Sequence, residues 1–145
     1  MPIENSVIGE GTKLWHPELV NIYDSTIGSG CNVGIFVEIG GASIGNNTRI
    51  GAFSFICPGV VIGDGVFIGP RVTFTNDKLP PSVGKWKPTK TTVEDKVSIG
   101  AAAVILPGVV LEKGCVIGAG AVVTKDVPAG KRWVGVPACD IKERN

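Results

Sequence analysis

The sequence predicts an all-β fold, a left-handed parallel β-helix built from six-residue repeats. Glycine is unusually frequent, at 21 of 145 residues, and large apolar residues recur every six positions over most of the chain. The repeating apolar positions are Ile27, Val33, Ile39, Ile44, Ile50, Ile56, Ile62, Ile68, Phe74, Val93, Ile99, Ile105, Leu111, Ile117 and Val123. Because a short internal period is typical of stacked solenoid coils, we expect one domain over residues 1–145.

The even period determines which side chains point inward. In an extended strand, residues i, i+2 and i+4 share a face, and a turn in each repeat leaves i and i+4 inside. The i+4 positions hold small or apolar residues, among them Cys31, Val37, Thr48, Ser54, Val60, Val66, Val72, Val97, Ala103, Val109, Cys115, Ala121 and Val127. Three such strands per coil form a triangular prism, and a glycine after the apolar residue relieves crowding at the bend. Parallel crossovers are usually right-handed, so the left-handed winding is predicted from this specific repeat.

Two interruptions of the repeat carry information. The step from Ile39 to Ile44 is five residues, which indicates a one-residue deletion at a corner. Between Phe74 and Val93 the period is lost, and residues 75–92 read TNDKLPPSVGKWKPTKTT. We expect this segment to project from the prism, as a replacement for a coil or as an insertion at a corner. Long loops in compact domains are usually functional or mobile.

Composition excludes several classes of function. The net charge is +1, from 14 basic and 13 acidic side chains, which disfavours a nucleic-acid partner. No run of apolar residues approaches the roughly 18 of a membrane span. The first residues, MPIENSVIGEG, lack the features of a signal peptide, so we expect a cytoplasmic protein without a membrane partner. One histidine and four cysteines without a CxxC pair predict no metal site.

Several segments resemble the bacterial hexapeptide-repeat acyltransferase superfamily over essentially the whole chain. The tail GAGAVVTKDVP (118–128) and VGVPA (134–138) resemble the acetyl-CoA-binding end of these enzymes. The resemblance implies acetyl-CoA as cosubstrate and a homotrimer with active sites between neighbouring chains. Outward-facing aromatic residues also predict a packed interface, at Phe36, Phe53, Phe55 and Phe67.

Two further segments, GEGTKLWH (9–16) and VFIGPRVTFTND (66–77), narrow the resemblance. They are similar to N-acetyltransferases that act on 3-amino sugars carried on UDP or dTDP, for surface glycans such as lipopolysaccharide. The chain departs from that pattern at Pro80-Pro81 and at Cys139, where the family often has arginine. An O-acetyltransferase, another acyltransferase with a different acceptor, and a non-catalytic scaffold remain as alternatives. A scaffold would not need Asn76 or the 118–128 tail.

The resemblance places the acceptor chemistry at the start of the projecting segment. It implies that Asn76 holds the acceptor amine and that Asp77 assists its orientation or proton removal, whereas Asn-Asp also commonly begins a turn. His16, the only histidine, is expected about three coils from Asn76, roughly 14 Å away, at another corner. We therefore expect His16 to contact the nucleotide end of the acceptor, or to be a surface residue beside Trp15. The amine would attack the thioester directly, without a histidine base, through positioning and backbone stabilisation of the oxyanion.

The binding residues are predicted in three groups. Lys78 and Trp86 in the basic segment, with Glu38 at the corner before the shortened repeat, are candidates for the acceptor. Lys125, Lys131 and Arg132 form a second basic cluster, for the 3′-phosphate of coenzyme A. Small corner residues would let the pantetheine arm lie against the backbone, at Ala101, Ala119 and Gly120. Solvated lysines and the steric demands of a corner are the alternative explanations.

Overall fold

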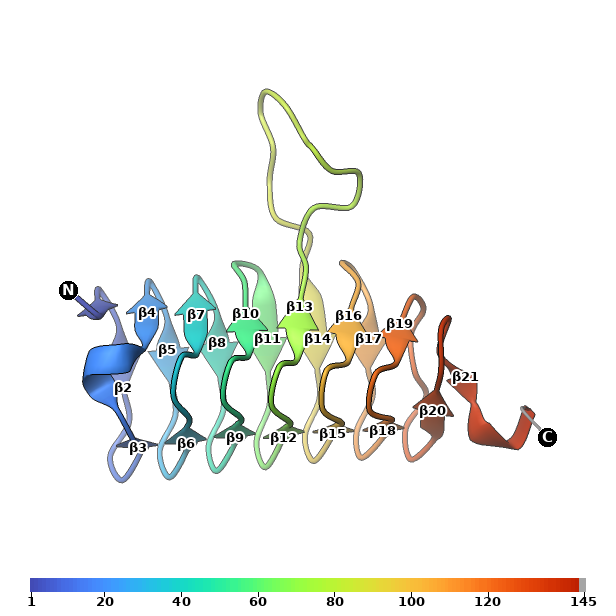
Figure 1. Ribbon diagram of the computed structural model, residues 1–145, viewed down its shortest axis with the longest axis horizontal. Coiled ribbons are helices and arrows are strands. Elements are labelled where there is room, and N and C mark those ends of the chain that lie inside the picture. The colour runs from blue at the N-terminus through green and yellow to red at the C-terminus, as the bar shows by residue number, and fades with distance from the viewer. Residues whose placement is uncertain (144–145) are drawn as a thin grey trace.

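The computed structural model describes residues 1–143 and confirms the predicted parallel β-helix. Coils of short strands stack along one axis, from the N-terminus at the left of Figure 1 to the C-terminus at the right. Strands on the near face run upward and those behind run downward as the chain advances, so the helix is left-handed (Figure 1). Three parallel sheets form the faces of the prism.

The sheets share one pattern, in which each strand pairs in parallel with the equivalent strand of the next coil. The last strand of sheet C, Cys139–Asp140, departs from it and pairs antiparallel with Arg132–Val134. Sheet A has seven strands, β1 (Ile3–Glu4), β4 (Asn21–Tyr23), β7 (Glu38–Gly40), β10 (Phe55–Ile56), β13 (Thr73–Phe74), β16 (Val104–Ile105) and β19 (Val122–Val123). Sheet B has six, β2 (Val7–Ile8), β5 (Thr26–Ile27), β8 (Ser43–Ile44), β11 (Val60–Ile62), β14 (Thr91–Val93) and β17 (Val110–Leu111). Sheet C has eight, β3 (Lys13–Leu14), β6 (Asn32–Val33), β9 (Arg49–Ile50), β12 (Phe67–Ile68), β15 (Ser98–Ile99), β18 (Val116–Ile117), β20 (Arg132–Val134) and β21 (Cys139–Asp140).

Three corners join the sheets, and we name them by the order in which the chain meets them. The first corner leads from sheet A to sheet B, the second from B to C, and the third from C back to A. Short 3-10 helices lie after β3 (η1, Pro17–Leu19) and after β21 (η2, Ile141–Glu143). Within residues 1–143, no helix is both long enough and apolar enough to cross a membrane.

The repeat forms the core. Ile22, Ile39, Ile56 and Phe74 lie in successive strands of sheet A and are completely buried. The buried hydroxyl of Thr48 donates to the Gly63 carbonyl at 3.0 Å and accepts from the Val66 amide at 3.3 Å. A buried polar group is costly only when it lacks such partners, so hydroxyls are accepted at i+4 positions of this core.

The second corner adds a ladder of polar side chains. Oδ1 of Asn46 accepts from the Ser29 amide at 2.9 Å, Asp64 accepts from the Asn46 amide at 2.7 Å, and Asp95 accepts from the Asp64 amide at 2.7 Å. Each side chain thus satisfies a turn amide of the preceding coil, which explains these residues without a ligand.

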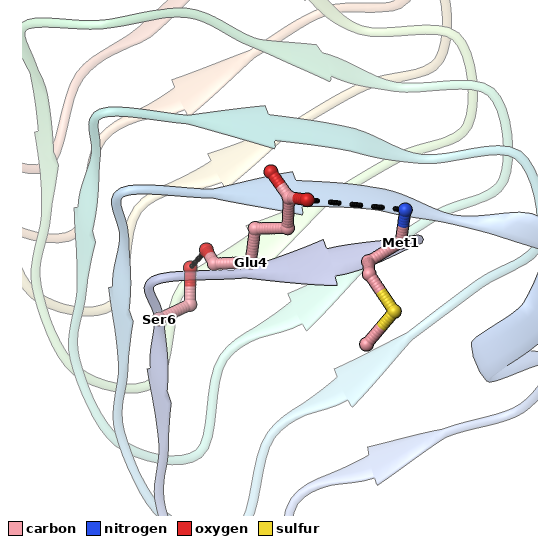
Figure 2. A network of polar contacts seen from close by, with 3 residues as sticks. All are labelled: Met1, Glu4 and Ser6. Atoms are coloured by element: carbon pink, nitrogen blue, oxygen red, sulfur yellow. Dashed lines mark hydrogen bonds and ion pairs between the residues drawn. The ribbon is translucent and has the colours of Figure 1, made fainter.

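The first coil begins with polar contacts at its exposed edge. Figure 2 shows the N-terminal ammonium group of Met1 at 3.9 Å from Oε1 of Glu4, and the Ser6 hydroxyl donating to the Glu4 carbonyl at 2.8 Å. The core phase continues into this coil, because Ile8 pairs with Ile27 and Leu14 with Val33.

The projecting segment is an insertion at the first corner and does not replace a coil. Strands β13 and β14 are consecutive faces of one coil, and the loop between them rises far above the prism (Figure 1). The predicted boundary of 75–92 needs a correction at its end. Thr91 and Thr92 belong to β14 and pair with Val60 and Val61, because their side chains resume the core alternation.

Candidate acceptor and coenzyme sites

A hollow of about 410 Å³ lies where the projecting loop leaves sheet A. Phe55, Thr73 and Thr75 form its floor, Leu106 and Pro107 border it, and the start of the loop (Asn76–Lys78) borders the other side. Apolar walls with a few convergent polar groups are typical of small-molecule sites. The structure therefore brings Asn76, Asp77 and Lys78 together beside one hollow, as the sequence predicts.

Asn76 is fixed in place and keeps one free acceptor. Its Nδ2 donates to the Pro58 carbonyl at 2.9 Å, and its own carbonyl accepts from the Thr89 amide at 3.1 Å. Within residues 1–143, nothing donates to its Oδ1, and no side-chain polar atom there is buried without a partner. Oδ1 is therefore a positioned, solvent-accessible acceptor, which suits an N–H or O–H group of a ligand.

Asp77 has its carboxylate occupied by the loop itself. Oδ1 accepts from the Leu79 amide at 3.2 Å and from the Ser82 hydroxyl, and Oδ2 accepts from the Ser82 amide at 2.9 Å. The hydrogen bond from the Ser82 hydroxyl, helped by these backbone amides, lowers the pKa of Asp77. An aspartate held as an anion by loop donors is a weak base, so the geometry favours the turn interpretation. A role for Asp77 in orientation of the acceptor stays a prediction.

Of the other predicted acceptor residues, Lys78 lines this hollow and Trp86 does not. The Lys78 ammonium group reaches the first corner of the next coil, since a Cβ built on Gly108 would lie 3.8 Å from its Nζ. Trp86 lies in the projecting loop, with 43% of its surface exposed. It does not line the hollow, so contact of Trp86 with an acceptor stays a prediction.

The predicted position of Glu38 is wrong. It does not lie at a corner but in β7, directly beside Phe55 of the neighbouring strand on the outer surface of sheet A. The strand ends after Gly40, so the missing residue of the repeat falls at Gly41, where φ is +54°. The Tyr23 hydroxyl donates to Glu38 Oε2 at 3.4 Å. Burial, reinforced by the Glu38 charge, raises the pKa of Tyr23, a residue that the sequence analysis missed.

Ala101, Ala119 and Gly120 lie at the third corner, as predicted. Successive coils touch closely there, because a Cβ built on Gly100 would lie 2.5 Å from the Ala119 nitrogen. Within the described chain, the backbone N–H groups of Ala101 and Ala119 donate no hydrogen bond. This corner therefore offers a row of small side chains with free amide donors, which suits the amide-rich pantetheine arm. Binding of the coenzyme stays a prediction.

The three predicted phosphate-binding cations do not form one cluster. Lys125 follows β19 at the first corner, whereas Lys131 lies at the second corner, just before Arg132 in β20. The bridge between Leu111 and Val127 places the intervening residues on the sheet B face, which separates the two corners. Lys131 pairs with Asp140 at 3.6 Å, and Arg132 is exposed beside it.

His16 lies at the third corner, where it precedes η1, and its Nδ1 is 3.1 Å from Glu18 Oε1. Strands β7 and β10 separate β4, which follows η1, from β13, which precedes Asn76. The predicted separation of His16 from Asn76 by three coils and one corner is thus confirmed.

The repeats match a family model described as bacterial transferase hexapeptide (six repeats), at residues 41–76 and 90–125. A curated relative, the bifunctional protein GlmU of Streptomyces griseus subsp. griseus, is 35% identical over 83 residues, which cover 52% of this chain and 17% of GlmU. The chain thus spans about a sixth of that relative's length.

Two solved structures extend the comparison. A variant of AntD, an N-acyltransferase from Bacillus cereus in complex with dTDP-4-amino-4,6-dideoxyglucose and coenzyme A, superposes with a TM-score of 0.72. It is 21% identical, and the match covers 94% of this chain and 82% of AntD. Soybean serine acetyltransferase is 32% identical with a TM-score of 0.59, over 70% of this chain and 40% of that enzyme.

Fold, repeat and corner geometry define a left-handed β-helix protein of the hexapeptide type. The six-residue repeats of this chain are those of the bacterial transferase hexapeptide family, whose model they match at residues 41–76 and 90–125.

Proposed function

We propose that the chain is an acetyl-CoA-dependent N-acetyltransferase that acetylates the amine of a UDP- or dTDP-linked amino sugar, with the amine at the 3-position. Surface glycan synthesis in the cytoplasm is the corresponding role. The observation that carries the proposal is the free Oδ1 of Asn76 at the edge of an apolar hollow, in a side chain whose Nδ2 donates to the Pro58 carbonyl. The complex of AntD with a dTDP-amino sugar and coenzyme A supports the substrate class.

The chemistry needs positioning more than a strong base. Asn76 Oδ1 accepts one N–H of the neutral sugar amine and directs the nitrogen lone pair at the thioester carbonyl. A C–N bond forms, the C–S bond breaks, and the departing thiolate of coenzyme A is protonated as the amine proton leaves to water. Free backbone N–H groups at the third corner suit the carbonyl oxygen as it becomes negative. Positioning of this kind is worth several kcal/mol.

The two halves of this site lie at different corners of one chain. Asn76 lies at the first corner, whereas Ala101 and Ala119 lie at the third, with sheet A between them. We infer that the working site forms in a homotrimer, where the first corner of one chain meets the third corner of a neighbour. The exposed Phe36 and Phe53 of the third corner supply apolar surface for that contact. Phe67 is exposed on sheet C instead, and Phe55 is half-buried in the floor of the hollow.

The second candidate function is O-acetylation, which the likeness to soybean serine acetyltransferase supports. A hydroxyl acceptor needs a base near the reacting atoms, because an alcohol is almost fully protonated at neutral pH. His16 lies three coils from Asn76 along the prism axis and the loop donors occupy Asp77, so the described residues of the hollow favour an amine.

An acetyl-CoA thiol-release assay with a panel of acceptors tests the proposal. We expect release only with nucleotide-linked amino sugars, and fastest release with the 3-amino compounds. Release with serine or with sugar hydroxyls would establish the O-acetyltransferase alternative. No release with any acceptor, together with no binding of coenzyme A, would identify a scaffold.

A further inference from the structure

A second hollow, of about 490 Å³, lies away from Asn76, on sheet C and the third corner of the N-terminal coils. We call it the Trp15 groove, after the residue at its N-terminal end. Its lining includes Asn32, Arg49, Ala52 and Phe67. None of these side chains has a part in the acetyl transfer described above.

Strand register aligns the polar floor of the groove. Lys13 pairs with Asn32, Asn32 with Arg49, and Arg49 with Phe67, so their outward side chains form one row across sheet C. Glycines and Ala52 line the adjoining corner, and their small size leaves the hollow open. A Cβ built on Gly51 would lie 2.5 Å from the Pro70 nitrogen, so a larger side chain cannot replace this glycine and fill the hollow.

The charge of the groove is positive and unpaired. Within residues 1–143, neither Lys13 nor Arg49 forms an ion pair, and no acidic residue lines the hollow. The Ala52 amide, which borders the hollow, donates no hydrogen bond there. A guanidinium beside a free backbone N–H suits the oxygens of a phosphate.

The walls of the groove are aromatic and exposed. Trp15 is 56% exposed and Phe67 is 45% exposed, although aromatic rings of this size are normally covered. The Lys13 ammonium group lies 3.3 Å from the centroid of the Trp15 ring, which holds the indole against the strand. Flat apolar rings beside cations suit a ligand with a planar base and an anionic group.

The geometry points to a binding site for a nucleoside diphosphate in the Trp15 groove. The base stacks against Trp15 and Phe67, and Arg49 with the Ala52 amide holds the diphosphate. The third corner itself continues from the groove to Ala101 and Ala119, because Gly51 lies against Pro70, Gly69 against the Ala101 backbone and Gly100 against the Ala119 backbone. A nucleotide in the groove would thus lie in line with the proposed pantetheine site, and its role in acetyl transfer rests on the proposed function.

Two molecules carry this chemistry, the acceptor's pyrimidine nucleotide and the adenosine diphosphate of coenzyme A. Separate titrations with UDP, dTDP and coenzyme A, followed by calorimetry and by the indole N–H resonance of Trp15, distinguish them. Trp15→Phe assigns that resonance. The ligand that moves it at the lowest concentration identifies the source.

Arg49→Gln is expected to weaken binding of that ligand about tenfold or more, since a charge-assisted hydrogen bond is lost. Phe67→Ala should also weaken it, whereas Lys113→Gln, which removes one charge at the second corner, should leave the affinity unchanged. An unmoved Trp15 resonance, or equal affinities for Arg49→Gln and Lys113→Gln, would overturn the assignment.

The test of the nucleotide site can fail or succeed independently of the proposed acetyltransferase function. Binding in the groove without turnover would leave the nucleotide site standing and refute the acetyltransferase. Turnover with an unchanged acceptor KM and coenzyme A KM in Arg49→Gln would do the reverse.

Discussion

At the residue scale, neighbours of similar chemistry have different surroundings in this protein. Asn76 points its amide nitrogen at Pro58 and keeps a free oxygen, whereas both oxygens of Asp77 are bound by the loop. The difference arises because the Pro58 carbonyl belongs to the preceding coil and Ser82 belongs to the loop. The sequence alone lists both residues as candidates, and the tertiary contacts separate them.

Asn76→Ala is expected to lower kcat about 100-fold or more, the size of effect seen when one positioned polar group is lost at a reacting centre. His16→Ala should instead raise the acceptor KM with kcat nearly unchanged, because His16 lies three coils away. Steady-state kinetics on both variants and on Asn21→Ala, an exposed control in β4, measure this. If His16→Ala abolished turnover at an unchanged KM, the division of roles would be wrong.

The cysteines give a second prediction at this scale. Burial raises the pKa of Cys57 and of Cys115 to about 11 each. Both should therefore remain unmodified by iodoacetamide at pH 8 in the folded protein, whereas the partly exposed Cys139 should react. Peptide mass spectrometry after timed labelling measures the rates.

The same thiols make stability depend on alkaline pH. In the unfolded chain these thiols have an ordinary pKa near 9. Their contribution to the free energy of unfolding is therefore fully present below about pH 9 and is lost as the pH rises to about 11. Equal labelling rates for Cys57 and Cys139 at pH 8 would contradict this account.

At the element scale, the residues at the corners determine how closely successive coils pack, more than the residues in the strands do. Sheet strands contain only two or three residues each, and the contact between coils depends on small residues after them. At the third corner, three residues with large side chains adopt the left-handed backbone conformation, which is unfavourable for residues other than glycine. They are Phe36, Phe53 and Arg71, with φ of +57°, +65° and +59°. Ring contact accompanies this conformation, since Phe36 and Phe53 lie 5.2 Å apart and the Arg71 guanidinium lies 4.6 Å from the Phe53 ring.

A pair of glycines at the second corner tests the importance of coil contact. Gly45→Ala places a Cβ 2.6 Å from the Gly63 carbonyl carbon, whereas Gly114→Ala meets no atom within 4 Å but has φ of +70°. We expect Gly45→Ala to destabilise the fold by more than about 4 kcal/mol, and Gly114→Ala by only about 1–2 kcal/mol. Urea unfolding measures both, and equal losses would show that backbone conformation outweighs contact between coils.

At the scale of the whole molecule, one chain carries two half-sites that face different directions. The homotrimer joins them and should have a mass near three times 15.0 kDa by light scattering. A monomer in solution would contradict the shared site.

Mixed trimers give a sharper test. Asn76→Ala and Ala119→Trp should each be inactive alone, because each damages one half-site. After joint refolding of equal amounts, about a quarter of the sites should combine an intact first corner with an intact third corner. Acetyl-CoA turnover of the mixture measures this, and no recovery would show that both half-sites act within one chain.

The six-residue repeat by itself determined the fold and its core. Most inward positions follow from a period that matches the strand alternation, so the buried residues from Ile27 to Val127 were predictable without coordinates, except for Ala42, Cys57 and Thr91 beside the interruptions and corners. The same repeat located the projecting loop, because the loop is where the period fails. The groove could also have been found, since Arg49 and Phe67 lie one coil apart on an outward row.

Only the tertiary structure decided which interrupted positions meet. It placed the loop at a corner, moved Glu38 onto a strand, and separated Lys125 from Lys131. A periodic sequence specifies which way each side chain faces, but it does not specify the corner at which a deletion or an insertion is absorbed. The corner at which a residue lies therefore depends on how the strands of successive coils pair. Contacts between coils establish that pairing, and the local sequence does not.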